Sequence, residues 1–578
     1  MTMTLSKKIL IIPAVLLVAL FCSNISANAI SREVAYLQTD RTTYIAGESI
    51  FYKLYVLDAD TRKRSEISKV GYVLLRTTGS GSSLKVRVRI DSGMACGSIL
   101  LPDTLASGAY QLVAFTSGMR NSQEQGFYYQ DITIANRFDK ELKFKLVNSI
   151  APDSNFLKPS NKETVIKTDK KVYGLREKVV VSLENLVSKA NTSVSVYEIP
   201  VLSPRVKTIV ETMNNTLPTV PDNAHKLFYH SLENKTKILN GRVIDVVTNK
   251  VVNEAVVLLS CNDTVPNLQY AVTNADGKFQ LLLSDYYDGK ELFLTIKDVP
   301  AGQQLKIETE DEFAQNQPWN SSLISGSSDF KDYIVKSQNI VYINKSYQLN
   351  NDLVDKSVGD INSICPQFYH STGTTILPSD FVSLDDFPEI VVEILPQVLI
   401  TRDKGKPRIK VYNTLIKMFN RNSPAIFLDG VFVDDVNKIL VLGSEQIKKI
   451  DVFEVERAFG DLVFSGVISI VTKSNEILNT KPALHSLRLK NDRVNTGGSL
   501  VTINPDQILS KDLPIFKQLL YWNPNLELKG KNTTNFEFYT SDNAANYMIQ
   551  IEGISEDGSP ISSSSGIQVI NQPNVTNK

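Results

Sequence analysis

A motif that occurs twice at a fixed separation is the feature that most constrains the fold of this 578-residue chain. Residues 39–48, TDRTTYIAGE, recur as residues 168–177, TDKKVYGLRE, at an offset of 129 residues. Alternating apolar residues follow both copies, over 50–56 after the first and over 179–183 after the second. A repeat that is followed by a strand pattern each time predicts two structural units of one type.

The residues around the first copy have the pattern of a β-sandwich. In Leu84–Ile90, apolar residues alternate with three cations, so one face of this strand is apolar and the other charged. Ser107–Tyr110 predicts a turn that leads into another strand. Short strands separated by turns predict a mainly β fold class of tandem β-sandwiches.

Both copies of the motif resemble the macroglobulin-type domains of α2-macroglobulin-like proteins. In those domains a Thr-Asp-Lys/Arg-x-x-Tyr-x-x-Gly-(Glu/Asp) segment joins two strands. The second copy carries Arg176 where the pattern has glycine, so we expect its turn to be built differently. The resemblance implies one macroglobulin-like sandwich over 30–137 and a second over 138–222.

A third module is predicted over 223–302. Gly241–Asp245 reads Gly-x-Val-x-Asp, the apolar strand Ala255–Leu259 follows, and Asp276-Gly277 predicts a hairpin. This ordered set resembles the carboxypeptidase-regulatory, transthyretin-like fold. A generic sandwich shares the turn chemistry but not the whole order. After it, residues 303–379 are expected to be a polar linker with a helix over Asp329–Asn350.

An α+β unit is predicted over 380–480. Pro424–Val431 is an apolar strand that ends in Asp429-Gly430, and Phe464–Lys473 is a second strand rich in β-branched residues. Asp385–Leu395 predicts a capped helix with one apolar face. The segment resembles the plug domain of TonB-dependent outer-membrane transporters.

A last β-module is predicted over 481–578. Its Tyr521–Pro524 opening and its Glu552–Gly558 turn resemble the closing macroglobulin-like domain of Gram-negative envelope proteins with this layout. A plugged barrel uses about 22 strands, and only about a hundred residues follow the plug-like segment. We therefore expect a plug-like domain that lacks a barrel of its own.

Residues 1–29 are predicted to be a signal peptide. Lys7 and Lys8 precede a short apolar run, and Ala27–Ala29 supplies the small residues for cleavage before Ile30. The alternative is lipid attachment at Cys22, which is disfavoured by the bulky residue before it. No later run is long enough to span a bilayer. The expected location is the periplasm or the outer membrane.

Charge and cysteine content narrow the classes of function. Without its signal the chain has 60 basic and 62 acidic residues, which gives no attraction for nucleic acid. Cys96, Cys261 and Cys365 lie far apart and lack CxxC spacing, so structural zinc is not expected. Cys261 ends an apolar run and is interpreted as a buried apolar residue.

No catalytic, cofactor-binding or metal-binding residues are predicted. The four histidines lack HExxH spacing, and the sequence has no Gly-x-Ser-x-Gly elbow, Walker loop or thioester Cys-Gly-Glu-Gln. Acid pairs occur at Asp385-Asp386, Asp434-Asp435 and Glu556-Asp557. Each pair lies at an expected helix start or turn, which favours a structural role.

These observations favour a non-enzymatic envelope protein that binds an outer-membrane or periplasmic protein, in association with a TonB-linked transport or assembly system. Asp429 and Gly430 are the candidate partner contact. The alternative is a macroglobulin-like, non-covalent protease inhibitor of the periplasm, with Gln303–Ser328 as bait. An enzyme with an unrecognised site ranks last.

Overall fold

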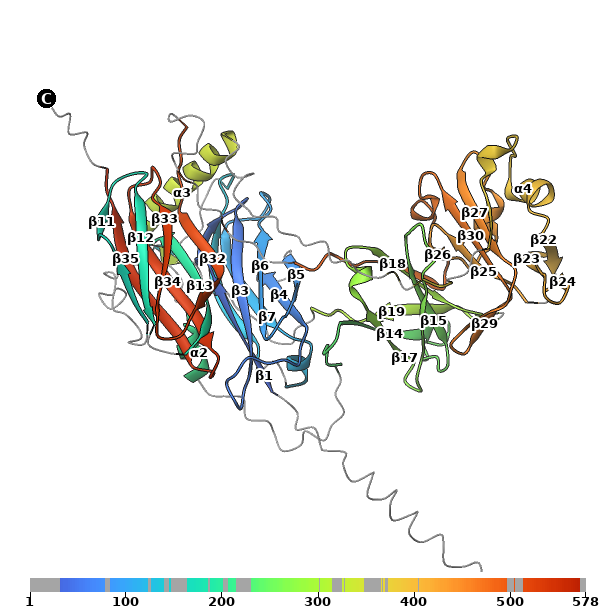
Figure 1. Cartoon of the computed structure of the whole chain (residues 1–578), viewed down its shortest axis with the longest axis horizontal. Helices are drawn as coiled ribbons and strands as arrows, with labels where there is room; N and C mark the ends of the chain where they lie inside the picture. The colour runs from blue at the N-terminus through green and yellow to red at the C-terminus, as the bar shows by residue number, and fades with distance from the viewer. Residues whose placement is uncertain are drawn as a thin grey trace, which may run out of the picture.

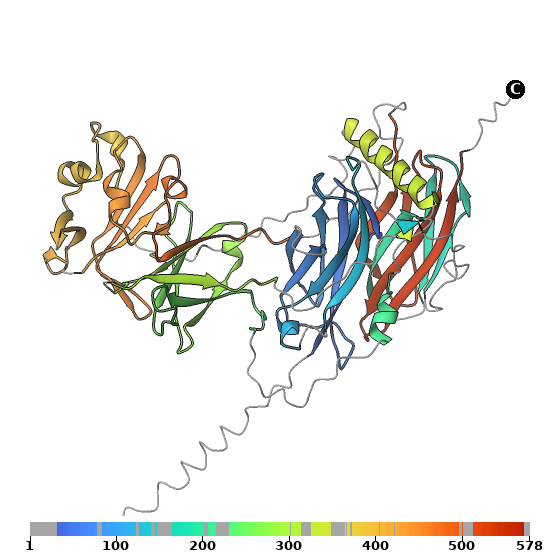
Figure 2. The same cartoon turned by 180° about the vertical axis from the view of Figure 1, so that it is seen from behind.

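The chain forms two lobes that are connected by extended segments (Figures 1 and 2). The computed structural model describes residues 32–77, 84–122, 126–139, 145–146, 164–185, 188–200, 206–214, 230–300, 302–313, 325–326, 328–347, 365, 367–369, 373–403, 405–420, 422–495, 500, 504 and 513–571. The fold is mainly β, with tandem β-sandwiches and one α+β unit, as predicted. Among the helices described, none combines the length and the apolar character that crossing a membrane requires.

The first sandwich spans residues 33–135 and consists of two sheets, with strand orders β1-β3-β6 and β2-β8-β7-β4-β5. Its core includes Tyr36, Leu54, Val73 and Phe115, which are buried between the sheets. The elements are β1 (Glu33–Thr39), β2 (Thr43–Ile45), β3 (Ser49–Asp58), β4 (Val70–Arg76), β5 (Leu84–Arg89), β6 (Met94–Leu100), β7 (Gly108–Phe115), η1 (Gly118–Ser122) and β8 (Tyr128–Ala135).

The second sandwich is assembled from two distant parts of the chain, residues 164–198 and 519–569. Its sheets have the orders β10-β12-β33 and β11-β35-β34-β13-β32, which match the first sandwich strand for strand. In Figure 1 teal strands from the first part and red strands from the second lie side by side in both of its sheets. The elements are β10 (Thr164–Thr168), β11 (Val172–Tyr173), β12 (Lys178–Asn185), β13 (Ala190–Glu198), β32 (Leu519–Leu528), β33 (Thr533–Tyr539), β34 (Asn546–Ser555) and β35 (Pro560–Val569).

This assembly corrects the two separate domains predicted over 138–222 and 481–578. Strand β13 pairs with β32 from Ala190↔Leu528 to Tyr197↔Leu519, and β12 pairs with β33. Neither half has enough strands to cover its own apolar face, so each completes the other. The residues between β13 and β32 are an insertion at the position of the β4–β5 hairpin of the first sandwich.

The repeated motif makes the same hydrogen bonds in both sandwiches. The Tyr44 hydroxyl donates to Asp40 Oδ1 at 2.9 Å, and the Tyr173 hydroxyl donates to Asp169 Oδ1 at 2.8 Å. The expected difference at Arg176 is wrong. Its φ of 56° lies in the left-handed region, as does the φ of 94° at Gly47. The Arg176 guanidinium forms two 2.6 Å hydrogen bonds to Asp542, which offset the strain.

A polar seam joins the first and second sandwiches. The Tyr55 hydroxyl lies 3.1 Å from Ser193 Oγ, and Ser195 Oγ donates to the Asp40 carbonyl at 2.6 Å. The buried Lys53 ammonium donates to Asn191 and to Pro524 O. Burial lowers the pKa of Lys53 to about 7 because the charged form is desolvated.

Helix α3 (Ser328–Ser346) lies across both sandwiches of the large lobe, as Figure 2 shows. Phe330 and Ile334 pack in one apolar cluster with Ile45 of the first sandwich. Lys336 pairs with Glu198 of the second sandwich at 2.8 Å. The predicted helix is therefore confirmed as far as Ser346, and residues 348–350 of the predicted range Asp329–Asn350 lie outside the described residues. The remaining short elements of this lobe are α2 (Ile209–Asn214), β9 (Lys145–Leu146) and β20 (Ser325–Gly326).

The third sandwich contains sheets of order β17-β14-β19 and β16-β15-β18-β31. Three expectations are corrected here. Strand β31 lies in the range predicted for the last β-module, 481–578, but it pairs with β18 of this sandwich. Residues 305–309 form strand β19 rather than linker, and Asp276-Gly277 connects strands of different sheets rather than forming a hairpin. The elements are β14 (Lys237–Asp245), β15 (Val256–Cys261), β16 (Gln269–Val272), β17 (Lys278–Leu283), η3 (Asp285–Tyr287), β18 (Glu291–Ile296), β19 (Leu305–Thr309) and β31 (Ser486–Lys490).

The α+β unit, residues 374–478, has a central sheet of order β21-β27-β30-β25-β26. Helix α4 covers this sheet. As predicted, Asp386 caps the helix, and its apolar face buries Phe387 and Ile390. The elements are β21 (Thr374–Ile376), η4 (Pro378–Asp380), α4 (Phe387–Ile394), β22 (Val398–Asp403), β23 (Lys406–Asn413), β24 (Met418–Phe419), β25 (Ala425–Leu428), β26 (Val431–Phe432), α5 (Asn437–Leu440), β27 (Ile447–Phe453), β28 (Arg457–Phe459), β29 (Leu462–Phe464), β30 (Val467–Thr472) and η5 (Glu476–Leu478).

The third sandwich and the α+β unit together form the small lobe. Leu258 of β15 packs with Phe427, Phe432 and Phe464 in one buried cluster that belongs to both units. The Phe432 amide donates to Ser260 Oγ of the sandwich at 3.1 Å. Buried aromatic contacts of this kind hold the two units against each other.

Candidate functional site

A polar cluster between the lobes starts from strand β5. Its alternating sequence places Lys85, Arg87 and Arg89 on one face. All three cations reach residues outside the first sandwich. Lys85 pairs with Asp311 at 3.2 Å and Arg89 pairs with Asp285 at 2.8 Å. The charged face of β5 therefore contacts the small lobe and the segment that leads from it.

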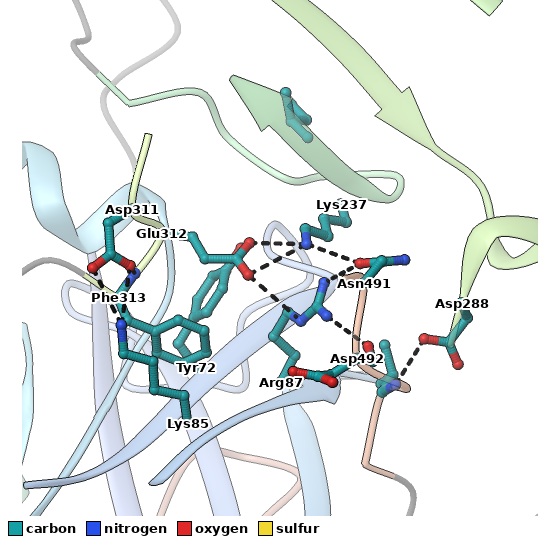
Figure 3. Close-up of polar contacts among 12 residues, drawn as sticks. Tyr72, Lys85, Arg87, Lys237, Asp288, Asp311, Glu312, Phe313, Asn491 and Asp492 are labelled. Atoms are coloured by element: carbon teal, nitrogen blue, oxygen red, sulfur yellow. Dashed lines mark hydrogen bonds and ion pairs between the residues drawn. The ribbon is translucent and has the colours of Figure 1, made fainter. Parts of the chain in front are cut away.

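Arg87 is the buried member of this row. Its Nη1 donates to Asn491 Oδ1 at 2.6 Å, and its Nη2 donates to the Asp492 carbonyl at 2.5 Å (Figure 3). Its Nε lies 3.6 Å from Glu312 Oε1. A planar guanidinium suits such multiple contacts because its donors lie in a fixed geometry.

Glu312 also accepts from Lys237 of β14, at 3.0 Å. Lys237 Nζ donates in addition to Asn491 Oδ1 at 3.1 Å, so two cations share the same two acceptors (Figure 3). Burial lowers the pKa of Lys237, and the nearby Glu312 carboxylate partly opposes this shift.

Two aromatic rings cover one side of the cluster. Phe313 packs edge-to-face on Tyr72 of β4 with 5.2 Å between ring centroids, and Lys85 lies 5.3 Å from the Phe313 centroid. The Tyr72 hydroxyl donates to both oxygens of Glu233, at 2.9 and 2.8 Å. Burial raises the pKa of Glu233 to about 7.

The segment that leaves β31 runs through the same cluster. Asn491 Nδ2 donates to the Tyr287 carbonyl at 2.6 Å, and the Val494 amide donates to Asp288 at 2.7 Å. The Asn495 amide then donates to the Arg87 carbonyl at 2.7 Å. This segment is therefore bonded first to the third sandwich and then to the first.

The cluster borders a cleft of about 530 Å³. Small-molecule sites have similar volumes, but they are mostly apolar with a few convergent polar groups. Here Arg87, Lys237 and Glu312 are already paired with one another. Groups that pair with one another in this way connect the two lobes. We interpret the site as a joint between the lobes.

The structure places the predicted partner contact, Asp429 and Gly430, inside the molecule. Asp429 is 1% exposed and accepts from the Thr472 amide at 2.7 Å and the Ile477 amide at 3.2 Å. The Asp263 amide donates to the Asp429 carbonyl at 3.0 Å. The turn thus fixes the α+β unit to the third sandwich, and its burial contradicts a role as a surface for a partner.

The acid pairs have the structural roles that the sequence favoured. Asp386 accepts from the Glu389 amide at 2.9 Å at the start of α4, and Asp435 accepts from the Asn437 amide at 3.1 Å before α5. Asp434 Oδ2 lies 3.2 Å from His485 Nε2. Hydrogen bonds from Ser555 and Ser559 lower the pKa of Asp557 to about 2.

The described cysteines, Cys96, Cys261 and Cys365, are all free. Cys261 is buried as predicted, and burial raises its pKa to about 12. Cys22, His225 and His370 lie outside the described residues. Within the described ranges, no group of three or more metal-ligating side chains could hold an ion.

The sequence predicted β5 as an alternating strand, but it did not predict that the cations of β5 would connect the two lobes. Their partners, Glu312 and Asn491, lie more than two hundred residues away in sequence. The only signal was the row of cations itself, which a solvated strand face would also show.

Comparison with known proteins places the chain in no family, because no family description and no curated protein matches it. Among solved structures it aligns with Escherichia coli alpha-2-macroglobulin activated by porcine elastase, at 8% identity over 93% of this chain and 44% of that chain, with a TM-score of 0.24. The native E. coli protein gives 10% identity, 94% and 40% coverage and a TM-score of 0.24.

The adhesin InvE of Yersinia pseudotuberculosis aligns with 48% of this chain and 58% of that chain, at 10% identity and a TM-score of 0.12. The chain spans less than half the length of the two macroglobulins above. Likenesses this weak carry no argument about fold or function, so the proposals below depend on the residues of this chain.

Proposed function

We propose that this chain is a non-enzymatic binding protein of the Gram-negative cell envelope, with the α+β unit as its recognition module. The observation that carries this proposal is where large apolar side chains reach solvent. Of the 28 exposed large apolar residues in the described chain, twelve lie between Leu377 and Val463. Exposed apolar side chains that gather in one region mark interaction sites.

The remaining units act as a base for this module. The large lobe is rigidified by the seam and α3, and the joint at Arg87 connects it to the small lobe. The predicted signal peptide supports export, and the plug-like sequence supports a partner in an outer-membrane transport or assembly system. Burial of Asp429 and Gly430 moves the expected partner contact elsewhere on the α+β unit.

Cross-linking followed by capture from envelope extracts tests the proposal. Phe381 and Val382 are 50% and 77% exposed on the α+β unit. Val246 and Val247, on the third sandwich, are 51% and 72% exposed and serve as a matched control. We expect the wild type and the control with both valines changed to serine to capture the same envelope protein, and the Phe381→Ser/Val382→Ser variant to lose it. Equal capture by all three proteins would refute the proposal.

The second candidate is a non-covalent protease inhibitor of the macroglobulin type. The two sandwiches with matching strand orders and the shared motif support this reading. Its expected bait, Gln303–Ser328, begins with strand β19, which is hydrogen-bonded in a sheet and is a poor protease substrate. Residues 314–324 lie outside the described residues. Limited proteolysis separates the candidates, because bait cleavage in an inhibitor compacts the protein and traps the protease, whereas nicking of a scaffold does neither.

A further inference from the structure

The three-stranded sheet β22-β23-β24 of the α+β unit, residues 398–420, has two unlike faces. One face buries Val398, Ile409 and Val411 in the core of the unit. The strand register places the alternate residues on the opposite, outer face. The outer-face pairs are Leu399 with Lys410, Thr401 with Arg408, Asp403 with Lys406, and Tyr412 with Phe419.

This sheet is strongly basic in a chain with equal numbers of acidic and basic residues. Its described residues include one acid, Asp403, and five cations: Arg402, Lys406, Arg408, Lys410 and Lys417. Asp403 pairs with Arg408 at 3.0 Å. Within the described structure the other four cations form no ion pair, so the surface keeps a net positive charge. We refer to residues 398–420 as the basic ribbon.

The turn between β23 and β24 adds an apolar tip to the basic ribbon. Leu415 is 74% exposed, and Ile416 and Met418 are also exposed. Lys417 has a φ of 53°, which lets the chain reverse at the tip. Phe419 packs edge-to-face on Tyr412 with 5.3 Å between centroids, so aromatic rings lie between the tip and the cations of β23. The ribbon lies at the outer end of the small lobe (Figure 1).

We propose that the basic ribbon docks the small lobe on the surface of an anionic lipid bilayer. This inference goes beyond the proposed function, since it concerns lipid rather than a protein partner. Large apolar side chains beside aromatic rings and lysines are the combination that inserts at the boundary between headgroups and acyl chains. The lysine ammonium groups contact anionic headgroups while their aliphatic stems lie along the apolar surface.

An acidic protein is the other occupant that the charge would suit. The apolar residues argue against it, because the tip is a projecting hairpin turn rather than a groove, and charge pairing does not require Leu415 or Ile416 to be exposed. A bilayer uses both features at once: charge attracts the ribbon to the surface, and burial of the tip retains it.

Sedimentation of the full chain with phospholipid vesicles tests this inference. Vesicles of phosphatidylcholine mixed with phosphatidylglycerol are compared with vesicles of phosphatidylcholine alone. We expect binding only to the anionic vesicles, weakened by salt because the charges are exposed. In a Leu415→Trp variant, tryptophan emission should shift to shorter wavelength when anionic vesicles are added, which reports insertion of the tip.

Two surface variants and one control complete the test. Lys406→Gln/Lys410→Gln should weaken vesicle binding roughly 25-fold at low salt, since each cation near an anionic surface contributes about fivefold. Leu415→Ser/Ile416→Ser should weaken it by roughly tenfold or more through lost apolar burial. Lys529→Gln/Lys531→Gln removes the same charge from exposed positions of the second sandwich and should bind as the wild type does.

Three results would overturn the inference: no binding to anionic vesicles, equal binding to neutral ones, or no effect of the tip variant. Binding of soluble polyglutamate that depends on Lys406 and Lys410 but not on the tip would also overturn it, in favour of an acidic protein. Capture of an envelope protein through Phe381 and Val382 is measured without vesicles, so either proposal can fail alone.

Discussion

Glu552 is a carboxyl group that the fold buries completely at the seam between the first and second sandwiches. The Ile209 amide donates to its Oε2 at 3.1 Å, and Ser562 donates to its Oε1 at 2.8 Å. Burial raises the pKa of Glu552 from 4.5 to about 7 because the carboxylate loses its hydration. Its contribution to stability is therefore complete below pH 4.5 and is lost as the pH rises to about 7.

Glu552→Gln should remove this pH dependence, because the amide imitates the protonated acid. At about pH 8 the free energy of unfolding of the variant should exceed that of the wild type by on the order of 2 kcal/mol. Near pH 4.5, where the wild-type side chain is protonated, the two proteins should be equally stable. Denaturant unfolding at both pH values measures the difference. Parallel pH profiles for the two proteins would contradict the assignment.

Gly430 has to be a glycine because a neighbouring backbone segment leaves no room for a side chain. Its φ is 79°, and a Cβ placed on it would lie 2.5 Å from the Asp263 carbonyl oxygen. Gly405 has a similar φ of 81°, but a Cβ there would meet nothing within 4 Å. The two glycines therefore share backbone strain and differ in the backbone contact.

Gly430→Ala should lower the melting temperature of the small lobe clearly more than Gly405→Ala does. The control, Gly405→Ala, should lose only the stability that a left-handed alanine costs, about 1 kcal/mol. Gly430→Ala must also push β25–β26 away from Asp263, since the obstructing atoms are backbone. Calorimetry of both variants measures this. Equal losses would mean that the turn does not fix the α+β unit to the third sandwich.

At the scale of elements, α3 is the helix that connects the two sandwiches of the large lobe. One face buries Phe330 and Ile334 against Ile45, whereas the next residue, Val335, lies about 100° further around the helix and is 43% exposed. Gln518 of the second sandwich donates to Ser337 at 2.6 Å. Docking of α3 therefore depends on both sandwiches being in place.

Ile334→Ala should weaken the docking of α3 by about 2–5 kcal/mol, because it leaves a cavity in a buried cluster. Hydrogen exchange should then be faster for α3 amides, while the sheets of the first sandwich keep their protection. Val335→Ala, one position along the helix, should have little effect on exchange. If exchange of the sheets accelerated together with α3, the helix would be part of the sandwich's cooperative unit.

At the scale of the whole molecule, two arginines of strand β5 contact the small lobe, and their polar contacts differ in burial. Arg87 is buried and contacts Asn491, Asp492 and Glu312. Arg89 makes a half-exposed pair with Asp285. Water screens exposed pairs, so they contribute about 0–1 kcal/mol, whereas breaking a buried network costs several times more.

Arg87→Ala should loosen the arrangement of the lobes, and Arg89→Ala should leave it unchanged. Small-angle X-ray scattering should show a larger radius of gyration and a broader distance distribution for Arg87→Ala only. Added salt should have little effect on the wild-type profile, because the decisive contacts are buried. Identical profiles for both variants would mean that Arg87 does not hold the lobes together.

The sequence alone determined features that depend on residues close together in the chain. In the repeated motif, Tyr44 donates a hydrogen bond to Asp40, four residues earlier. Asp386 caps α4 by accepting from the amide of Glu389, three residues later. The side chains of β5 point alternately to its two faces, as in any strand. These local interactions made the mainly β fold class and the structural roles of the acid pairs predictable.

Tertiary structure decided which surfaces meet, because nothing local encodes it. Strand β32 reads as the start of a new module, yet it joins a sheet only by pairing with β13, more than three hundred residues earlier. Asp429-Gly430 has the sequence of an exposed turn and is buried by Asp263. Strand patterns fix which face is apolar, but burial is complete only when a distant strand covers that face, and several strands of similar pattern compete to do so.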